Sequence, residues 1–285
     1  MLNKWSSIVK PDVLAGALHE PNLVILDCRF SLQVPSAGYE AYQMSHIPGA
    51  HYLSLDNDLS ASPMEHGGRH PLPTVQSLEH LCTDLGISED TQVVVYDDQR
   101  FAFAARCWWM LRAFGHASVS VLDGGFSNYQ SLGFPCSNQE EARPQSLSSE
   151  RLGLQAPMTS TVTLDCVRSK VQPGALIDSR HPDRFAGLKE PIDPVAGHIP
   201  GAVNYFWQQV TDEKGWLRSP QELRKHFAAI ADRDDLVVYC GSGVTACVNL
   251  LALEIAGIQG AKLYPGSWSD WCSYPLNEAW EIIED

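Results

Sequence analysis

The chain has 285 residues, which suits two domains of about 100 to 150 residues each better than one compact domain. Its composition, 44% hydrophobic and 19% charged, can fill ordinary cores and excludes disordered, collagen-like and coiled-coil proteins. The formal net charge of -14 at pH 7 disfavours a nucleic-acid partner, and a small anion would need a local positive pocket to bind.

The N-terminal segment, residues 1–7, lacks the apolar core of a signal peptide, and no later run reaches the roughly 20 apolar residues of a membrane span. We therefore expect a cytoplasmic protein with no membrane partner. The eight cysteines are scattered, with no Cys-x-x-Cys pair and no histidine at zinc-ligand spacing. We expect no metal site and no cofactor, and most of the thiols should be reduced and buried.

Four landmarks of the first half recur in the same order in the second half. Ile-Leu-Asp-Cys-Arg at 25–29 corresponds to Leu-Ile-Asp-Ser-Arg at 176–180, and His-Ile-Pro-Gly-Ala occurs identically at 46–50 and 198–202. Val-Val-Val-Tyr-Asp at 93–97 corresponds to Leu-Val-Val-Tyr-Cys at 236–240, and Asp-Gly-Gly-Phe-Ser at 123–127 to Pro-Gly-Ser-Trp-Ser at 265–269. The offset is nearly constant, so the pattern indicates a duplicated domain.

Each copy alternates short β-branched runs with helical patterns, which predicts an α/β fold with a mostly parallel sheet flanked by helices. The stretch around 135–160 is rich in Ser, Gln, Glu and Pro and lacks periodicity, which is typical of a linker. We predict domains at 1–140 and 158–285, joined by a linker at 141–157. In the second copy, Ser219, Pro220 and Glu222 predict a capped helix start and a helix to about Ile230.

A cysteine stands where the strand at 236–239 ends. Cys240 opens a loop that contains Gly241 and Gly243 and leads into the apolar helical run 247–253. Ligands of open parallel sheets bind at such strand ends, and inward backbone amides beside a helix N-terminus stabilise a thiolate. An ordinary thiol has a pKa of about 8.5, so this setting would raise its reactive fraction at neutral pH. Any one of eight cysteines could be merely structural, but the loop favours Cys240 as a nucleophile.

The first copy has Asp97 at the position that corresponds to Cys240. It therefore lacks the thiol, and we expect the N-terminal domain to be catalytically silent.

The loop Cys-Gly-Ser-Gly-Val-Thr-Ala at 240–246, the paired His-Ile-Pro-Gly-Ala segments and the two glycine turns together resemble the tandem-domain rhodanese superfamily. The similarity extends over essentially the whole chain. The Gly and Ser after the cysteine resemble the 3-mercaptopyruvate sulfurtransferases of that superfamily, whereas its thiosulfate sulfurtransferases more often carry basic residues there.

The resemblance implies a double displacement. Cys240 would take sulfur from a small anionic donor, hold it as a persulfide, and pass it to cyanide, a thiol or a reduced thioredoxin. The persulfide anion needs hydrogen-bond donors. They would be the backbone amides of Gly241, Ser242, Gly243, Val244 and Thr245.

The resemblance also assigns residues outside the loop. Ser242 matches the family serine that relays a proton in a Cys-Ser-Asp arrangement, and the aspartate of that arrangement aligns with Asp56. His70 aligns with an active-site histidine of the family.

The donor's anionic group would bind Arg184, which matches the family's donor-binding arginine and whose fork suits a carboxylate or a sulfonate. A surface ion pair is the structural alternative. Mercaptopyruvate enzymes typically carry a second arginine after a Glu-Pro pair, but here Glu-Pro at 190–191 is followed by Ile192. Arg69 or Lys189 could take its place, or thiosulfate could be the better donor, so both donors remain open.

Two other functions are weighed against sulfur transfer. A cysteine loop at a helix N-terminus also occurs in phosphatases of the Cys-x5-Arg type, but the sixth position here is Ala246, which cannot clamp a phosphoryl group. A non-catalytic rhodanese-like binding or sensing module is the other alternative. The presence of Cys240 in a glycine loop argues against it.

Overall fold

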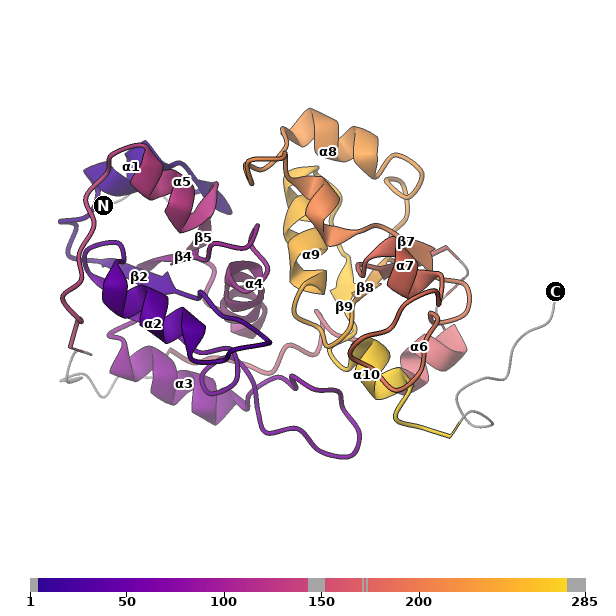
Figure 1. The fold of residues 1–285 in the computed structure, drawn as a ribbon. Coiled ribbons are helices and arrows are strands. Elements are labelled where there is room, and N and C mark those ends of the chain that lie inside the picture. Colours follow the sequence, from indigo (N-terminus) through magenta and orange to yellow (C-terminus); the bar gives the residue numbers. More distant parts are fainter. Residues whose placement is uncertain (1–4, 143–151, 171, 173, 276–285) are drawn as a thin grey trace. The chain divides into compact units, whose positions relative to one another are not determined.

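The computed structural model describes residues 5–142, 152–170, 172 and 174–275. The chain forms two compact units (Figure 1). Unit 1 comprises Met1–Ala61, Pro73–Ala156 and Thr211–Leu217, and unit 2 comprises Ser62–Leu72, Pro157–Val210 and Arg218–Asp285. Each half of the sequence therefore contributes one short segment to the other half's unit. The sequence patterns do not predict this exchange, and the predicted linker at 141–157 lies partly outside the described residues, so the domain boundaries stay predictions.

Unit 1 contains a five-stranded sheet in which every pairing is parallel, in the order β1-β5-β4-β2-β3. Alternate residues of a strand face opposite sides, and Val94 and Tyr96 share one buried cluster with Leu14 and Phe126. The strands are β1 (Ile8–Val9), β2 (Leu23–Asp27), β3 (Ala50–Tyr52), β4 (Gln92–Tyr96) and β5 (Val119–Leu122). The helices are α1 (Pro11–Gly16), α2 (Ala37–Met44), α3 (Val75–Asp84), α4 (Ala104–Phe114) and α5 (Gly125–Ser131).

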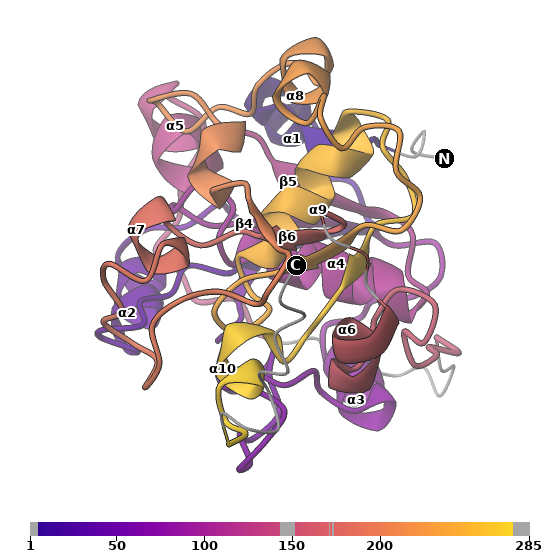
Figure 2. The same ribbon diagram turned by 90° about the vertical axis from the view of Figure 1, so that its right-hand side faces the viewer.

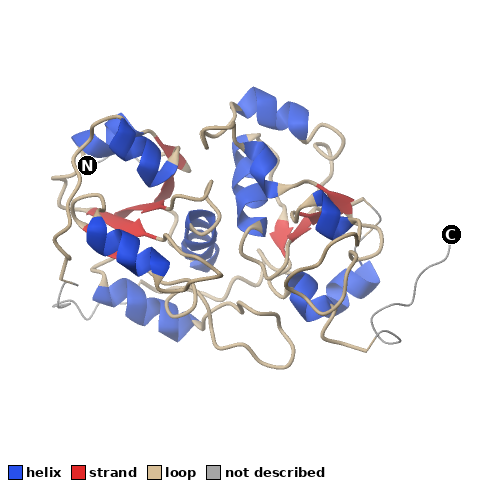
Figure 3. Cartoon of the chain, viewed as in Figure 1, coloured by secondary structure: helices blue, strands red, loops and turns tan. Residues whose placement is uncertain are grey.

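Unit 2 contains a four-stranded sheet, again entirely parallel, in the order β7-β6-β8-β9. Figure 3 shows the strands of both units in red and the helices around them in blue. Its strands are β6 (Leu176–Asp178), β7 (Val203–Asn204), β8 (Val237–Tyr239) and β9 (Lys262–Leu263). Its helices are α6 (Leu164–Lys170), α7 (Pro182–Phe185), the 3-10 turn η1 (Trp207–Val210), α8 (Pro220–His226), α9 (Ala246–Ile255) and α10 (Ser267–Trp271). The helix α9 lies beside β8 and β9, with α8 next to it in both views (Figures 1 and 2). The expected α/β class, with two mostly parallel sheets, is confirmed.

The repeated sequence landmarks make the same contacts in both units. In unit 1, Arg29 Nε donates to Asp27 Oδ1 at 3.0 Å, and in unit 2 Arg180 Nε donates to Asp178 Oδ1 at 3.1 Å. Both ion pairs are buried. In each arginine, Nη2 also donates to a backbone carbonyl, that of Ser45 for Arg29 and that of Gly197 for Arg180. A buried guanidinium needs such a full set of acceptors, which is why Asp-x-Arg recurs.

The His-Ile-Pro-Gly-Ala landmark is hydrogen-bonded to an inner strand of each sheet, β4 in unit 1 and β8 in unit 2. The Tyr96 hydroxyl accepts the N–H of Ile47 at 3.3 Å, and the Tyr239 hydroxyl accepts the N–H of Ile199 at 3.1 Å. The tyrosine before Asp97 and the tyrosine before Cys240 therefore have equivalent structural roles.

The helix predicted from Ser219 begins as expected. The side chains of Ser219 and Glu222 form both halves of a capping box, with Pro220 in the first turn. The predicted end near Ile230 is wrong, because α8 ends at His226. After Phe227 the backbone bonds tighten to the third preceding residue, and these turns bury Phe227 and Ile230 in the core. Among the described residues, no helix has the length and apolar content to span a membrane.

Candidate active site

Cys240 immediately follows β8, and the loop 240–245 leads into α9. Its side chain is buried, with 2% of the residue exposed. Its backbone N–H donates to Ser267 Oγ at 3.2 Å, and its carbonyl accepts the N–H of Trp268 at 3.0 Å. The carbonyl of Gly241 accepts the N–H of Ser269 at 2.9 Å. The start of the loop is therefore held in place by the segment that opens α10.

Gly243 is required by two independent features of this loop. Its φ of +74° lies in the left-handed region, which side chains disfavour. A Cβ atom at this position would lie 2.4 Å from the carbonyl oxygen of Pro265, which is backbone and cannot rotate away. The glycine thus allows the loop to pack against the end of β9.

The equivalent loop of unit 1 holds an acidic side chain among backbone amides. The Asp97 carboxylate accepts four N–H groups at 2.8–3.0 Å. They belong to Gln99, Phe101, Phe103 and Ala104. Burial raises the pKa of Asp97, while these hydrogen bonds oppose the shift. At the position equivalent to Cys240, the loop before a helix can therefore surround a carboxylate with backbone N–H donors.

Ser242 and His70 are in direct contact, although 172 positions separate them in the sequence. His70 Nδ1 lies 2.7 Å from Ser242 Oγ, and both side chains are buried. His70 belongs to the exchanged segment Ser62–Leu72, whose backbone is anchored by Gly67 N–H to Asp270 Oδ1 at 2.7 Å. The structure thus brings together two residues that the sequence proposes separately.

Asp56, the other expected partner of Ser242, lies in an exposed turn of unit 1. Its pairing with Ser242 stays a prediction. Val244 is buried and Thr245 is half-buried at the start of α9, as expected for loop residues that contribute their backbone rather than their side chains.

Arg184 forms ion pairs, and its partners Glu190 and Asp193 are nearly buried rather than on the open surface. Its Nε and Nη2 form a fork with the two carboxylate oxygens of Glu190, at 3.0 and 2.7 Å, and Nη2 also contacts Asp193 Oδ2 at 3.0 Å. Burial tends to raise the pKa of Glu190, but the hydrogen bond from Arg184 and two backbone N–H groups outweigh it and the pKa is lowered. Both Arg184 Nη atoms lie 3.6 Å from the Cβ position of Gly241. The guanidinium therefore borders the cysteine loop.

Arg69 borders the same loop. Its Nη1 forms an ion pair with Asp193 Oδ1, and its Nη2 lies 3.0 Å from the Cβ position of Gly241. Lys189 is exposed. The sequence offers Arg69 and Lys189 equally as replacements for the missing second arginine. The fold distinguishes them, because Arg69 borders the cysteine loop and Lys189 is exposed.

The other cysteines differ from one another in exposure and in the pKa of the thiol. All the cysteines of the described residues are free; Cys136 is exposed, Cys166 half-buried and the rest buried. Burial raises the pKa of Cys82 to about 12 and that of Cys272 to about 11, which keeps these thiols protonated at neutral pH. No group of three or more potential metal ligands occurs in the part of the chain that the structure describes.

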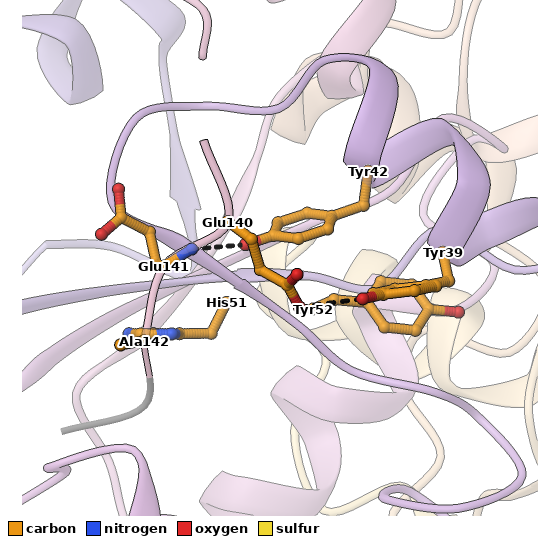
Figure 4. Close-up of a pocket in the computed structure, with 7 residues that line it drawn as sticks. All are labelled: Tyr39, Tyr42, His51, Tyr52, Glu140, Glu141 and Ala142. Atoms are coloured by element: carbon orange, nitrogen blue, oxygen red, sulfur yellow. Dashed lines mark hydrogen bonds between the residues drawn. The ribbon is translucent and has the colours of Figure 1, made fainter. Parts of the chain in front are cut away.

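Unit 1 has a pocket of about 530 Å³ that contains none of the predicted site residues (Figure 4). The Tyr39 hydroxyl donates to Glu140 Oε1 at 2.9 Å, and the Tyr42 hydroxyl accepts the N–H of Glu141 at 3.3 Å. The lining residues are Tyr39, Tyr42, His51, Tyr52, Glu140, Glu141 and Ala142. It has no cysteine and no arginine, and it is a feature of unit 1 separate from the loop at Cys240.

Comparison with known proteins gives consistent results. The model of the Rhodanese-like domain matches residues 10–132 and 163–274. A probable 3-mercaptopyruvate sulfurtransferase of Pseudomonas aeruginosa is 44% identical, over 92% of this chain and 93% of that protein. The thiosulfate sulfurtransferase of Bos taurus is 34% identical, over 97% of this chain and 93% of that protein. Among solved structures, 3-mercaptopyruvate sulfurtransferase from Leishmania major aligns with a TM-score of 0.81 and 30% identity, over 94% of this chain and 75% of that one.

Proposed function

The chain belongs to the rhodanese-like family, and on this premise we propose that it is a sulfurtransferase that carries sulfur as a persulfide on Cys240. The enzyme class predicted from the sequence agrees with the names of its curated relatives, which are 3-mercaptopyruvate or thiosulfate sulfurtransferases. The proposed donor is therefore 3-mercaptopyruvate or thiosulfate, both of which are small anions.

The first step transfers one sulfur atom from the donor. The Cys240 thiolate attacks the donor's transferable sulfur, a new S–S bond forms, and the bond that held the sulfur breaks. Its electron pair leaves with the donor remnant, which is the enolate of pyruvate for 3-mercaptopyruvate or sulfite for thiosulfate. The enolate then takes up one proton.

The second step releases the sulfur. A nucleophilic acceptor attacks the outer sulfur of the persulfide, and Cys240 leaves as a thiolate. Cyanide would give thiocyanate, and a thiol or a reduced thioredoxin would give a new persulfide. The chain returns to its starting state without a net redox change.

The loop amides would hold the persulfide anion between the two steps. The observation that carries this proposal is the amide ring around Asp97, because it occupies the equivalent position of the duplicated unit. After Cys240, the amides of Gly241, Ser242, Gly243, Val244 and Thr245 would have the same task for a sulfur anion. Preorganised amides of this kind stabilise a developing anion without a solvent rearrangement.

Ser242 and His70 would supply the proton. The hydroxyl of Ser242 lies beside the loop's glycines and contacts His70 Nδ1, so a proton lost by Ser242 can be replaced from the imidazole. Asp56 would complete the relay as the family resemblance implies. We propose Cys240, Ser242 and Asp56 as the catalytic residues, with His70 and Arg184 facing the donor.

The decisive test is mass spectrometry of the purified protein after treatment with each donor. Cys240 should become heavier by one sulfur atom, and the Cys240→Ser variant should gain nothing and form no thiocyanate from either donor. Cys136→Ser is the matched control, because Cys136 is exposed and is therefore the thiol most open to nonspecific sulfur uptake. An unmodified Cys240 with both donors would instead favour a non-catalytic binding module.

A further inference from the structure

Two arginines border the cysteine loop, and one buried carboxylate links them. Asp193 contacts Arg69 through Oδ1 and Arg184 Nη2 through Oδ2, and only 8% of Asp193 is exposed. Arg69 is fixed at its backbone too, since its N–H donates to Ser269 Oγ at 3.2 Å. Both arginines are therefore held by contacts within unit 2.

The arginine nitrogens that point to the loop are still available to a ligand. Arg69 Nη2 and Arg184 Nη1 make no hydrogen bond with any residue that the structure describes, while the other side of each guanidinium holds carboxylates. Both nitrogens lie against Gly241, at 3.0 Å and 3.6 Å from its Cβ position. Because Gly241 has no side chain, both guanidinium groups can approach the backbone directly after Cys240.

The charges of the cluster balance before a donor binds. Arg69 and Arg184 face the carboxylates of Asp193 and Glu190, so the site adds no excess positive charge to a molecule of net charge -14. One arginine alone, already forked with Glu190, would hold a donor anion weakly. Unused N–H groups on two arginines that border the same glycine can together receive both oxygens of one carboxylate.

We propose that Arg69 is the second donor-binding arginine of this enzyme, so that the carboxylate of an α-keto acid donor lies between Arg69 and Arg184. Arg69 thereby replaces the arginine expected after Glu190-Pro191, where this chain has Ile192. The inference rests on the proposed function. It favours 3-mercaptopyruvate over thiosulfate as the donor, because N–H groups from two guanidinium groups can bind the two oxygens of a carboxylate.

The test compares Arg69→Ala with Lys189→Ala, since Lys189 is an exposed cation, whereas the three heavy atoms nearest to the Cβ position of Gly241 belong to Arg69 and Arg184. With 3-mercaptopyruvate, Arg69→Ala should raise KM roughly 10- to 100-fold, the range of a lost charge-assisted hydrogen bond, and should change kcat little. Lys189→Ala should leave both constants unchanged. Arg69→Lys should restore part of the affinity, because lysine keeps the charge but not the fork.

A merely structural role of Arg69 is tested with mercaptoacetone, the donor in which a methyl group replaces the carboxylate. Single-turnover persulfide formation from mercaptoacetone should be equally fast in the wild type and in Arg69→Ala. Equal losses with both donors, or an unchanged KM for 3-mercaptopyruvate, would overturn the inference. If the wild type forms a persulfide on Cys240 in the same experiment, either of these contrary results refutes only the proposed role of Arg69. If the wild type forms no persulfide, the proposed function itself is refuted.

Discussion

Replacing Gly243 by alanine should damage the active loop far more than the fold. A non-glycine residue in the left-handed region costs about 1–2 kcal/mol. Gly243→Ala also forces a methyl group to within 2.4 Å of the Pro265 carbonyl oxygen, and overpacking of this kind costs about 1–3 kcal/mol more. We expect a total loss of about 2–5 kcal/mol in the free energy of unfolding of unit 2.

Activity should fall more steeply than stability. We expect the contact to be relieved by a shift of Gly243, which would displace the neighbouring amides proposed to hold the persulfide. The loss of even one such donor typically lowers kcat by about 100- to 1000-fold. We expect a loss at least this large in thiocyanate formation, measured on protein that is still folded at the assay temperature.

Gly257→Ala is the matched control. Gly257 has a nearly equal φ of +77° and belongs to the same unit, but nothing lies within 4 Å of its Cβ position. This variant should lose only the 1–2 kcal/mol or so of the backbone term and should keep its kcat. Urea unfolding measures the loss of stability of both variants, and the thiocyanate assay measures their kcat. If Gly243→Ala matched Gly257→Ala in both measurements, the proposal that the amides after Cys240 hold the persulfide would be refuted.

Two further outcomes follow from the arginine cluster. Arg184→Ala should raise the donor KM by roughly 10- to 100-fold with a smaller change in kcat, and an unchanged KM would contradict its place at the donor. The pKa of Glu190 is lowered in the native state, so the ionised carboxylate stabilises the fold at any pH above its unfolded pKa of about 4.5. This stabilisation is lost as the pH falls through the lower native pKa. Wild type should therefore be more stable than Glu190→Gln at pH 7, measured by urea unfolding, and the difference should disappear in acid. A difference that grows with acidification would show that Glu190 is not held ionised by Arg184.

The sequence by itself determined the features that depend on local pattern. The four repeated landmarks identify the duplication, and β-branched runs followed by helical patterns identify parallel α/β units. The loop after Cys240 is recognisable because a strand end, two glycines and a helix start are consecutive in the chain. The capped start of α8 is local in the same sense, whereas its end depends on how Phe227 packs, and the prediction there was wrong.

Only the tertiary structure decided which distant side chains meet the loop. The segment Ser62–Leu72 belongs to unit 2, and this brings His70 to Ser242 and Arg69 to Asp193. No periodicity or spacing records such contacts, because they arise from the packing of one segment against a surface built from residues about 120 to 200 positions away. The candidate nucleophile Cys240 could therefore be proposed from the chain alone, while the side chains proposed to bind the donor were brought together only by the fold.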